Sequence, residues 1–599
     1  MKKIPIEQIV KIPSYTFYCY RGREEIFFAS DKDGPSKVYQ INPETLEYQE
    51  YTTIPNLTTT TNFIWWKKGE EMIVNKDKDG DERFNVYLYN TKEQTETTLI
   101  ENEKSIDFIC SISPNKESLL ISSDQNGPSD LYTLNVETKE KKQITFHKYP
   151  CGEGFWCENG LVYYHSNDTE NRKNRDIYEI KSGGTEQRKI ISLSSDSADL
   201  LYETSRDGEL LLLSSDVEGI TKIGLYNTTK EELTWLSKTE YDEIPVNISL
   251  DKKKILALRD SPFRRYIVIY DIETGDEEIP ELEGQIYSTK FCYNDKYLIY
   301  SRSDPTSPGI LALYDLENKK EIPIIKEFAG FTKEDFVKAE KVQYKTFDGE
   351  KLNAVLYKPE RESGKKYPAV ILAPGGPGGR LTLSFYGFGQ VLVSEGFVVM
   401  SPHIRGSYGY GREFRETIIK DIGGIDGKDY VYAKKYLESL DFVDSNKIGI
   451  FGGSYGGYMT NLQLTKYAEV GWNAGASSVG ITHWKNMYDK SVPGFKLFIE
   501  YLFGTYEENK ELYEDRSPLN FVENIKAPIL IIQSINDMRC PVEEARNFKE
   551  KLLKIGKKEG EDFEYLEDSG KGHLLIGQDS LIRQYTLTLD FFKRKFLED

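Results

Sequence analysis

The residues best suited to covalent chemistry in this chain are a serine, an aspartate and a histidine in the last third of the sequence. Ser454 lies at the centre of the G-x-S-x-G pentapeptide 452–456, directly after an apolar run that ends at Phe451. A strand, a tight turn and a helix in this order form a nucleophile elbow, in which glycines leave the serine hydroxyl exposed at the end of the strand. The pentapeptide alone is a weak signal in a chain with 47 glycines, so the interpretation depends on its partners.

An acid and a base for this serine follow it along the chain. Asp537 comes shortly after the apolar run 528–533, which is typical of a strand buried on both faces of a parallel sheet. Open α/β sheets place their chemistry at the carboxyl edge of such strands. His573, the only one of the five histidines beyond Asp537, ends the small-residue loop 569–573. Taken singly, Asp537 would be interpreted as a helix N-cap and His573 as a surface-loop residue.

The order of the three residues decides between these interpretations. Serine, aspartate and histidine follow one another in this order in α/β-hydrolases, so we predict that Ser454, Asp537 and His573 form a catalytic triad. His573 would take the proton of Ser454 during attack on a carbonyl and return it to the leaving group. Asp537 would fix the imidazole tautomer and stabilise the imidazolium.

Two hydrogen-bond donors must meet the oxyanion that forms in this attack, each typically worth about 3–4 kcal/mol of the barrier. The backbone N–H of Tyr455 is one donor by the construction of the elbow. The glycine-rich turn 373–379, which follows the strand-like run 368–372, is the expected source of the second. We predict Gly376 as this donor, with Gly375 as the next choice.

The first 330 residues have a different character, with short apolar segments between turns rich in Asp, Asn, Gly and Ser. A hydrophobic residue followed, in most cases, by Asn or Asp recurs about every 44 to 48 residues, the length of a four-stranded propeller blade. A β-sandwich array would not keep so even a period, and the Asp-rich loops lack the ligand spacing of a calcium-binding EF-hand, so we predict no metal site there. Seven repeats therefore predict a seven-bladed β-propeller; their hydrophobic positions are Ile41, Tyr89, Leu134, Ile180, Tyr226, Tyr270 and Tyr314.

After residue 330 strands and helices alternate to the end of the sequence, starting from the predicted hairpin 342–357. This alternation is typical of a mostly parallel sheet with helices on both faces. We therefore predict a two-domain chain, with a β-propeller gating domain at 1–330 and an α/β-hydrolase catalytic domain at 331–599. Each part is long enough to bury its own core.

Composition excludes several classes of function. A net charge of −19 and a pI near 5.1 argue against a nucleic-acid partner, which would need a basic surface. The six cysteines include no C-x-x-C pair, which favours a reduced, cytoplasmic location. Glu7 and Lys11 interrupt any signal-peptide core, and no 18-residue apolar run predicts a transmembrane helix, so we expect no membrane association.

Several further motifs occur in one order along the C-terminal part, and together they resemble the prolyl oligopeptidase family of serine peptidases. The acylaminoacyl-peptidase-like branch of that family is the most similar. The propeller part resembles the family only through its repeat. The motifs that carry the resemblance are Phe347-Asp348-Gly349, Gly375-Gly376-Pro377, Arg405-Gly406-Ser407-Tyr408-Gly409-Tyr410-Gly411, Asp421-Ile422-Gly423-Gly424, Gly452-Gly453-Ser454-Tyr455-Gly456-Gly457-Tyr458, Asp537-Met538-Arg539-Cys540-Pro541 and Gly572-His573.

The resemblance implies that the propeller covers the active site and limits substrates to short peptides. It implies no metal and no organic cofactor, and self-association is common among such proteins. One position departs from the pattern: Pro374 stands where the branch usually has histidine and other branches have a tyrosine that serves the oxyanion. Proline offers neither a side-chain donor nor an N–H, so the second donor should be a backbone amide, again favouring Gly376.

Other residues of these motifs are candidates for binding the substrate. Arg405 follows the buried strand 397–400 and would either bind a substrate carbonyl or, as we prefer, brace the loops through ion pairs. We interpret His403 as structural. Trp484 and Tyr488 are predicted to line the pocket for the residue before the scissile bond.

Three functions remain for comparison. The leading prediction is a serine peptidase acting on short peptides, with dipeptidyl release, acyl-residue release and endopeptidase action all open. The alternative is a carboxylesterase, because the same triad cleaves small acyl esters. A third hypothesis is a propeller scaffold without catalysis, which the retained serine, acid, histidine and glycine turn argue against.

Overall fold

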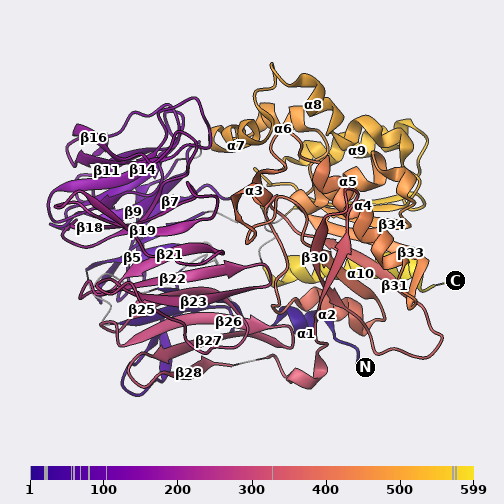
Figure 1. Cartoon of the computed structure of the whole chain (residues 1–599), viewed down its shortest axis with the longest axis horizontal. Helices are drawn as coiled ribbons and strands as arrows, with labels where there is room; N and C mark the ends of the chain where they lie inside the picture. The colour runs from indigo at the N-terminus through magenta and orange to yellow at the C-terminus, as the bar shows by residue number, and fades with distance from the viewer. Residues whose placement is uncertain are drawn as a thin grey trace.

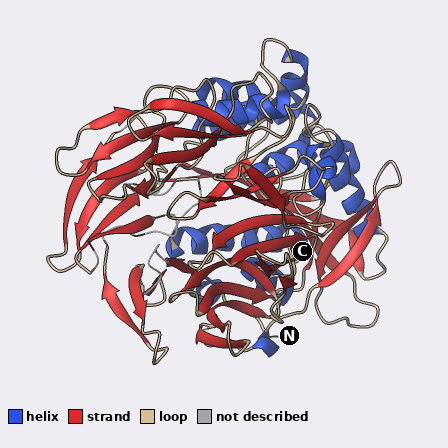
Figure 2. Cartoon of the chain, turned by 60° about the vertical axis from the view of Figure 1, so that its left-hand side comes forward, coloured by secondary structure: helices blue, strands red, loops and turns tan. Residues whose placement is uncertain are grey.

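The chain folds into an all-strand half and a mixed helix–strand half that lie side by side (Figure 1). Helices gather in the second half, whereas antiparallel strands fill the first (Figure 2). The computed structural model describes residues 2–598 except for 19–24, 35, 55–56, 58–60, 68, 78–80, 103, 327, 570–571 and 574–576.

The first half is the predicted seven-bladed β-propeller: the described residues form seven four-stranded antiparallel sheets, each made of consecutive strands. Blade 1 closes the ring by packing against blade 7, since Phe17 and Phe28 share a core cluster with Ile299 and Leu311. The strands of blades 1 to 4 are β1 (Tyr15–Tyr18), β2 (Ile26–Ser30), β3 (Lys37–Ile41), β4 (Tyr48–Thr52), β5 (Asn62–Lys67), β6 (Glu71–Lys76), β7 (Asn85–Asn90), β8 (Thr95–Ile100), β9 (Asp107–Ile112), β10 (Ser118–Ser123), β11 (Asp130–Asn135), β12 (Lys141–Gln143), β13 (Phe155–Trp156), β14 (Leu161–Ser166), β15 (Asp176–Lys181) and β16 (Thr185–Ile191). Blades 5 to 7 consist of β17 (Leu200–Thr204), β18 (Leu210–Ser215), β19 (Lys222–Asn227), β20 (Glu232–Trp235), β21 (Asp242–Ile248), β22 (Lys254–Ser261), β23 (Arg264–Asp271), β24 (Glu277–Glu278), β25 (Gln285–Cys292), β26 (Tyr297–Asp304), β27 (Ser307–Asp315) and β28 (Lys320–Ile325).

The repeat seen in the sequence marks the end of the third strand of each blade. There an Asn or Asp side chain accepts hydrogen bonds from the amides two and three residues further on, as Asn135 does from Glu137 and Thr138 at 3.1 and 2.8 Å. Such a bond closes the turn to the fourth strand without help from the rest of the protein. Blade 4 has Lys181 at this place and turns instead through Gly184, whose φ is +82°.

The second half is built on one eight-stranded sheet in the order β29-β30-β32-β31-β33-β34-β35-β36, parallel from β32 onward. Its strands are β29 (Glu340–Lys345), β30 (Lys351–Tyr357), β31 (Tyr367–Ala373), β32 (Val398–Pro402), β33 (Val443–Gly453), β34 (Ala474–Ser478), β35 (Ile529–Ser534) and β36 (Phe563–Asp568). The helical segments are α1 (Ile6–Val10), η1 (Lys333–Asp335), α2 (Gly387–Ser394), α3 (Gly411–Glu416), α4 (Ile425–Glu438), α5 (Tyr455–Thr465), η2 (Ala468–Val470), α6 (Trp484–Lys490), α7 (Pro493–Phe503), α8 (Lys510–Asp515), η3 (Pro518–Asn524), α9 (Val542–Lys554) and α10 (Gln578–Phe596).

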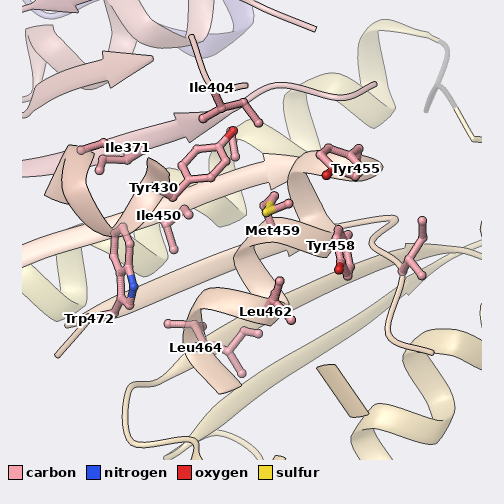
Figure 3. Packing of buried hydrophobic residues seen from close by; sticks show 14 of the residues in the cluster. Ile371, Ile404, Tyr430, Ile450, Tyr455, Tyr458, Met459, Leu462, Leu464 and Trp472 are labelled. Carbon is pink, nitrogen blue, oxygen red and sulfur yellow. The ribbon is translucent and has the colours of Figure 1, made fainter. Parts of the chain in front are cut away.

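Helices cover both faces of this sheet, as predicted for an α/β-hydrolase. The cluster on one face includes residues of α4, α5 and α9, and the cluster on the other includes residues of α2 and α10. Helix α5 is buried along its whole length, and Figure 3 shows its residues Tyr458, Met459 and Leu462 packed against the sheet.

The first described residues pack with the second half. Ile4, Ile6 and Ile9 belong to the cluster of α2 and α10, and α1 lies beside these helices (Figure 1). The predicted division, which assigned 1–330 to the propeller, therefore does not describe the packing of these residues, because α1 is too short to bury its apolar side chains alone.

Ion pairs join the two halves where they face each other. Arg172 pairs with Glu500, Arg380 with Asp260, and Arg539 with Glu82, at N–O distances of 2.6 to 2.7 Å. Within the described part of the chain, no helix combines the length and apolar character needed to cross a membrane. The cytoplasmic location stays a prediction.

Candidate active site

Ser454 occupies a strained turn between β33 and α5. Its φ of +57° and ψ of −120° are rarely adopted by residues other than glycine, as expected of a nucleophile elbow. The flanking glycines are required by space: a Cβ atom on Gly456 would lie 1.8 Å from the carbonyl oxygen of Ala373, and one on Gly452 would lie 2.5 Å from that oxygen. Close packing of the elbow against β31 thus explains the G-x-S-x-G pattern.

The structure brings Ser454, His573 and Asp537 into one hydrogen-bonded chain. His573 Nε2 lies 2.9 Å from Ser454 Oγ, and His573 Nδ1 lies 2.7 Å from Asp537 Oδ2. Asp537 and His573 are both buried, so their contact is shielded from water. Gly570 and Lys571 of the predicted histidine loop lie outside the described residues.

The second carboxylate oxygen of Asp537 is held by the backbone. Asp537 Oδ1 accepts hydrogen bonds from the amides of Arg539 and Cys540 at 2.9 and 2.8 Å. This turn leaves Oδ2 directed at the imidazole. Asp537 thus has both of the roles considered from the sequence. One carboxylate oxygen closes the turn before α9, much as an N-cap residue would, and the other orients the imidazole.

Asp537, Cys540 and His573 bring three metal-ligand types within 4.8 Å of one another. The arrangement does not fit a metal site, because both imidazole nitrogens already face Ser454 and Asp537. Burial also raises the pKa of the Cys540 thiol well above its usual value, which keeps the sulfur protonated and a poor ligand. The cluster is better explained by the hydrogen-bonded chain to the serine.

Two backbone amides are available beside Ser454 for a developing oxyanion. Tyr455 is the first residue of α5, and the turn 374–379 lies across the elbow, with a Cβ built on Gly375 only 3.8 Å from Ser454 Cβ. Within the described residues, neither the Tyr455 nor the Gly376 amide donates a hydrogen bond to another group. Both predicted donors are thus free to serve a substrate oxygen.

A buried contact behind the elbow was not foreseen from the sequence. The Tyr455 hydroxyl donates to Asp426 of α4, whose side chain is fully buried. Burial raises the pKa of the Asp426 carboxyl to about 7, although the bond from Tyr455 opposes this shift. The motif placed Tyr455 at the elbow but gave no sign of the partner 29 residues earlier in the chain.

Arg405 is a brace rather than a lining residue of a substrate pocket. Its guanidinium donates to both oxygens of Asp429 at 2.6 and 3.1 Å and pairs with Asp348 on the other side. It also lies over the ring of Phe347, 4.8 Å from the ring centre. Because these contacts engage Nε and both terminal nitrogens, they support the bracing role that the sequence analysis preferred, and Arg405 is withdrawn as a pocket candidate.

The prediction that Trp484 and Tyr488 line the substrate pocket is corrected, because both side chains belong to the core cluster around α5, α6 and α7. Trp484 is only 2% exposed and packs against Tyr458 and Phe503. The Tyr488 hydroxyl donates to Glu500 at 2.7 Å. The sequence indicated correctly that they follow a strand but not the direction in which their side chains point.

His403 lies in a fully hydrogen-bonded, buried position. Its Nε2 donates to the carbonyl oxygen of Leu381 at 2.7 Å, and Nδ1 accepts from the hydroxyl of Tyr410 at 2.6 Å. Burial lowers its pKa to about 4, so the ring stays neutral near pH 7. These contacts support the structural role that the sequence analysis preferred.

A cavity of about 620 Å³ lies between the two halves of the molecule. The propeller supplies the ends of its inner strands, including Leu200 and Tyr202 of β17, and the other half supplies α7 and the turn residues Pro377 and Gly378. The cavity therefore reaches the glycine-rich turn next to Gly376, at the side of the elbow.

Comparison with known proteins matches residues 384–599 to the model of the prolyl oligopeptidase family. An uncharacterized peptidase of Bacillus subtilis, YuxL, is 30% identical over 44% of this chain and 40% of its own length. Dipeptidyl-peptidase 5 of Schizosaccharomyces pombe is 29% identical over 44% of this chain and 38% of its own length. The chain thus spans about two fifths of the length of these curated relatives.

Solved structures share the whole fold at low sequence identity. A puromycin-hydrolyzing peptidase of Mycobacterium tuberculosis superposes with a TM-score of 0.85 at 17% identity, covering 100% of this chain and 96% of that one. The acylaminoacyl peptidase of Pyrococcus horikoshii gives a TM-score of 0.74 at 20% identity, covering 100% and 98%. At such identity the likeness concerns the architecture of propeller and hydrolase.

Proposed function

The C-terminal part of the chain carries a prolyl oligopeptidase family domain, and on that premise we propose that the protein is a serine peptidase. It hydrolyses short peptides through Ser454, His573 and Asp537. One observation carries the proposal: the His573 imidazole bridges Ser454 Oγ at 2.9 Å and Asp537 Oδ2 at 2.7 Å. Such a bridge is the arrangement that activates a serine hydroxyl.

The reaction proceeds in two halves. In the first, His573 accepts the Ser454 proton while Oγ bonds to the substrate carbonyl carbon, and the same proton then passes to the leaving amine as the C–N bond breaks. In the second, water attacks the acyl-enzyme with His573 again as base, and the proton returns to Ser454 as the acid is released. Asp537 keeps Nδ1 protonated throughout.

The amides of Tyr455 and Gly376 stabilise the oxyanion in both halves of the reaction. They are fixed by the start of α5 and by the turn 374–379, so they need little reorganisation when charge develops on the substrate oxygen. Pro374 offers no donor there, which leaves the work to backbone groups.

The cavity between the two halves supports a peptide substrate of limited size. Its volume of about 620 Å³ suits a peptide of a few residues, and the ion pairs between the two halves hinder the entry of a folded chain. Acylaminoacyl-type release, dipeptidyl release and cleavage within short peptides all fit a cavity of this size. A small acyl ester fits as well, so a carboxylesterase is the competing function.

Parallel hydrolysis assays test the proposal. Purified protein is given the p-nitroanilides of acetyl-Phe, Ala-Pro and blocked Gly-Pro, and a p-nitrophenyl ester, with Ser454→Ala as the control. Hydrolysis of at least one anilide that falls by about 10⁴-fold or more in the variant is the expected result. Turnover of the ester alone would assign the carboxylesterase function instead.

A fluorophosphonate probe tests catalysis independently of the substrate. Such probes label a serine only when its base and oxyanion donors are in place. We expect labelling of the wild-type protein and none of Ser454→Ala. A folded wild-type protein that stays unlabelled would support the scaffold hypothesis.

A further inference from the structure

The walls of the interdomain cavity carry several charged side chains, and nearly all of them are already neutralised. Arg172 pairs with Glu500, Lys173 with Glu416, and Arg415 with Asp216. Arg265 shares Asp260 with Arg380, so that one carboxylate serves two cations. These pairs leave little uncompensated charge on the cavity wall for a ligand.

Arg175 is the exception among the cavity-lining cations that the structure describes, because no carboxylate pairs with it. Its Nη1 donates to the carbonyl oxygens of Arg172 and Asn174 at 2.9 and 2.7 Å. These two bonds hold the guanidinium in place while Nε and Nη2 stay without an acceptor in the described part of the chain.

The surroundings of Arg175 make this free charge unusual. Burial lowers its pKa below the usual arginine value, which reflects the loss of water around the guanidinium. Apolar side chains that include Leu200, Tyr202 and Tyr501 line the same cavity. A cation in such surroundings gains from an opposite charge, and a ligand carboxylate would supply one.

We propose that Arg175 anchors a carboxylate of the substrate at the propeller end of the cavity, so that the enzyme prefers short peptides that carry a carboxylate over neutral ones. The inference rests on the proposed peptidase function. The free Nε and Nη2 offer the paired donors that match the two oxygens of a carboxylate. Pro377 and Gly378, which follow Gly376 in the glycine-rich turn, line the same cavity, so an anchored carboxylate sets how far the scissile bond lies from the substrate's charged group.

The test compares peptides that differ only in the carboxylate. Four substrates are used: acetyl-Phe-Ala-Ala with a free C-terminus, the same peptide amidated, the amidated peptide with aspartate as its last residue, and the amidated peptide with succinyl in place of acetyl. Cleavage is followed by chromatography for wild type, Arg175→Gln and Arg175→Lys. The three acidic peptides separate a C-terminal, a side-chain and an N-terminal source of the carboxylate.

We expect wild type to cleave at least one acidic peptide with a kcat/KM about 10- to 100-fold above that of the neutral peptide, as a charged hydrogen-bonded pair allows. Arg175→Gln should lose this preference through a raised KM and keep its activity on the neutral peptide, and Arg175→Lys should recover part of the preference. Arg188→Gln is the matched control, because Arg188 lies on outer strand β16 of the same blade and pairs with Glu179 at the surface. It should behave as wild type.

Two results would overturn the inference. Equal cleavage of acidic and neutral peptides by wild type would remove the carboxylate subsite, and an equal loss on all four peptides in Arg175→Gln would assign Arg175 a purely structural role. In both cases Ser454-dependent hydrolysis of a neutral p-nitroanilide still reports on the proposed peptidase function by itself. Failure of that assay, with labelling absent, would instead remove the function on which the inference rests.

Discussion

The blade turns of the propeller and the surroundings of the elbow in the hydrolase half satisfy their polar groups over different distances along the chain. In the propeller, turns such as the one at Asn135 are closed by a side chain that bonds to amides two and three residues away. In the hydrolase half, Tyr455 bonds to Asp426, and Arg405 to Asp429 and Asp348, at separations of 29, 24 and 57 residues. Local bonds can recur in every blade, whereas each distant one occurs once.

This difference predicts how mutations act in the two halves. A turn bond contributes only its own net free energy, because the turn remains accessible to water. When one member of a buried, distant ion pair is removed, the other member stays buried with its charge uncompensated. Damage to the hydrolase half should therefore be larger per side chain and should reach the active site.

Arg405→Ala should have the largest effect on stability. It leaves the buried Asp429 carboxylate without its counter-ion, which typically costs about 3–5 kcal/mol. The loss in unfolding free energy is measured by denaturant titration of the two proteins. Arg546→Ala, which removes an exposed pair with Glu567, is the control and should cost far less stability than Arg405→Ala. Similar losses in the two variants would contradict the comparison.

Asp426→Asn should change the pH dependence of stability. Burial raises the folded-state pKa of Asp426 from 3.8 to about 7, so the folded protein holds a proton that the unfolded chain releases between these values. Stability from this group is fully present below pH 4, falls as the pH rises, and stops falling above about pH 7.

The variant removes this titration while it retains an acceptor for the Tyr455 hydroxyl. Between pH 5 and 8 its unfolding free energy should therefore fall less with pH than that of wild type, as measured by denaturant titration at several pH values. Parallel curves for the two proteins would show that Asp426 titrates normally.

Asn135→Ala should have the smallest effect. The turn after β11 loses the two hydrogen bonds that the Asn135 side chain accepts from backbone amides. This loss is expected to cost about 1 kcal/mol. Hydrolysis of a p-nitroanilide should stay at the wild-type rate, and thermal unfolding should shift by a few degrees at most. A loss as large as that of Arg405→Ala would mean that the turns are not independent.

The sequence predicted the elements whose cause is local. The blade repeat was visible because six of the seven described turns after the third strand use an Asn or Asp that bonds to the following amides. The elbow was visible because backbone contacts with Ala373 exclude side chains at Gly452 and Gly456.

The pocket predictions failed where the direction of a side chain mattered. Trp484 and Tyr488 follow a strand, and that position places a residue near the carboxyl edge without deciding which way it points. Their directions are set by Phe503 and Glu500, which lie elsewhere in the sequence. Arg175 was missed for a related reason, because a cation without a partner cannot be distinguished in sequence from one that has a distant partner.

The two chain crossings between the halves meet at one point. Gln8 of α1 donates its side-chain amide to the carbonyl oxygen of Ala329 at 2.7 Å, and Phe331 packs in the same cluster as Ile6 and Ile9. The propeller is thus joined to the hydrolase half by two neighbouring chain segments. The ion pairs of Arg172, Arg380 and Arg539 are additional, noncovalent contacts between the halves. High salt should weaken these ion pairs without affecting the two connecting segments. Raised ionic strength should therefore admit longer peptides before it unfolds the protein.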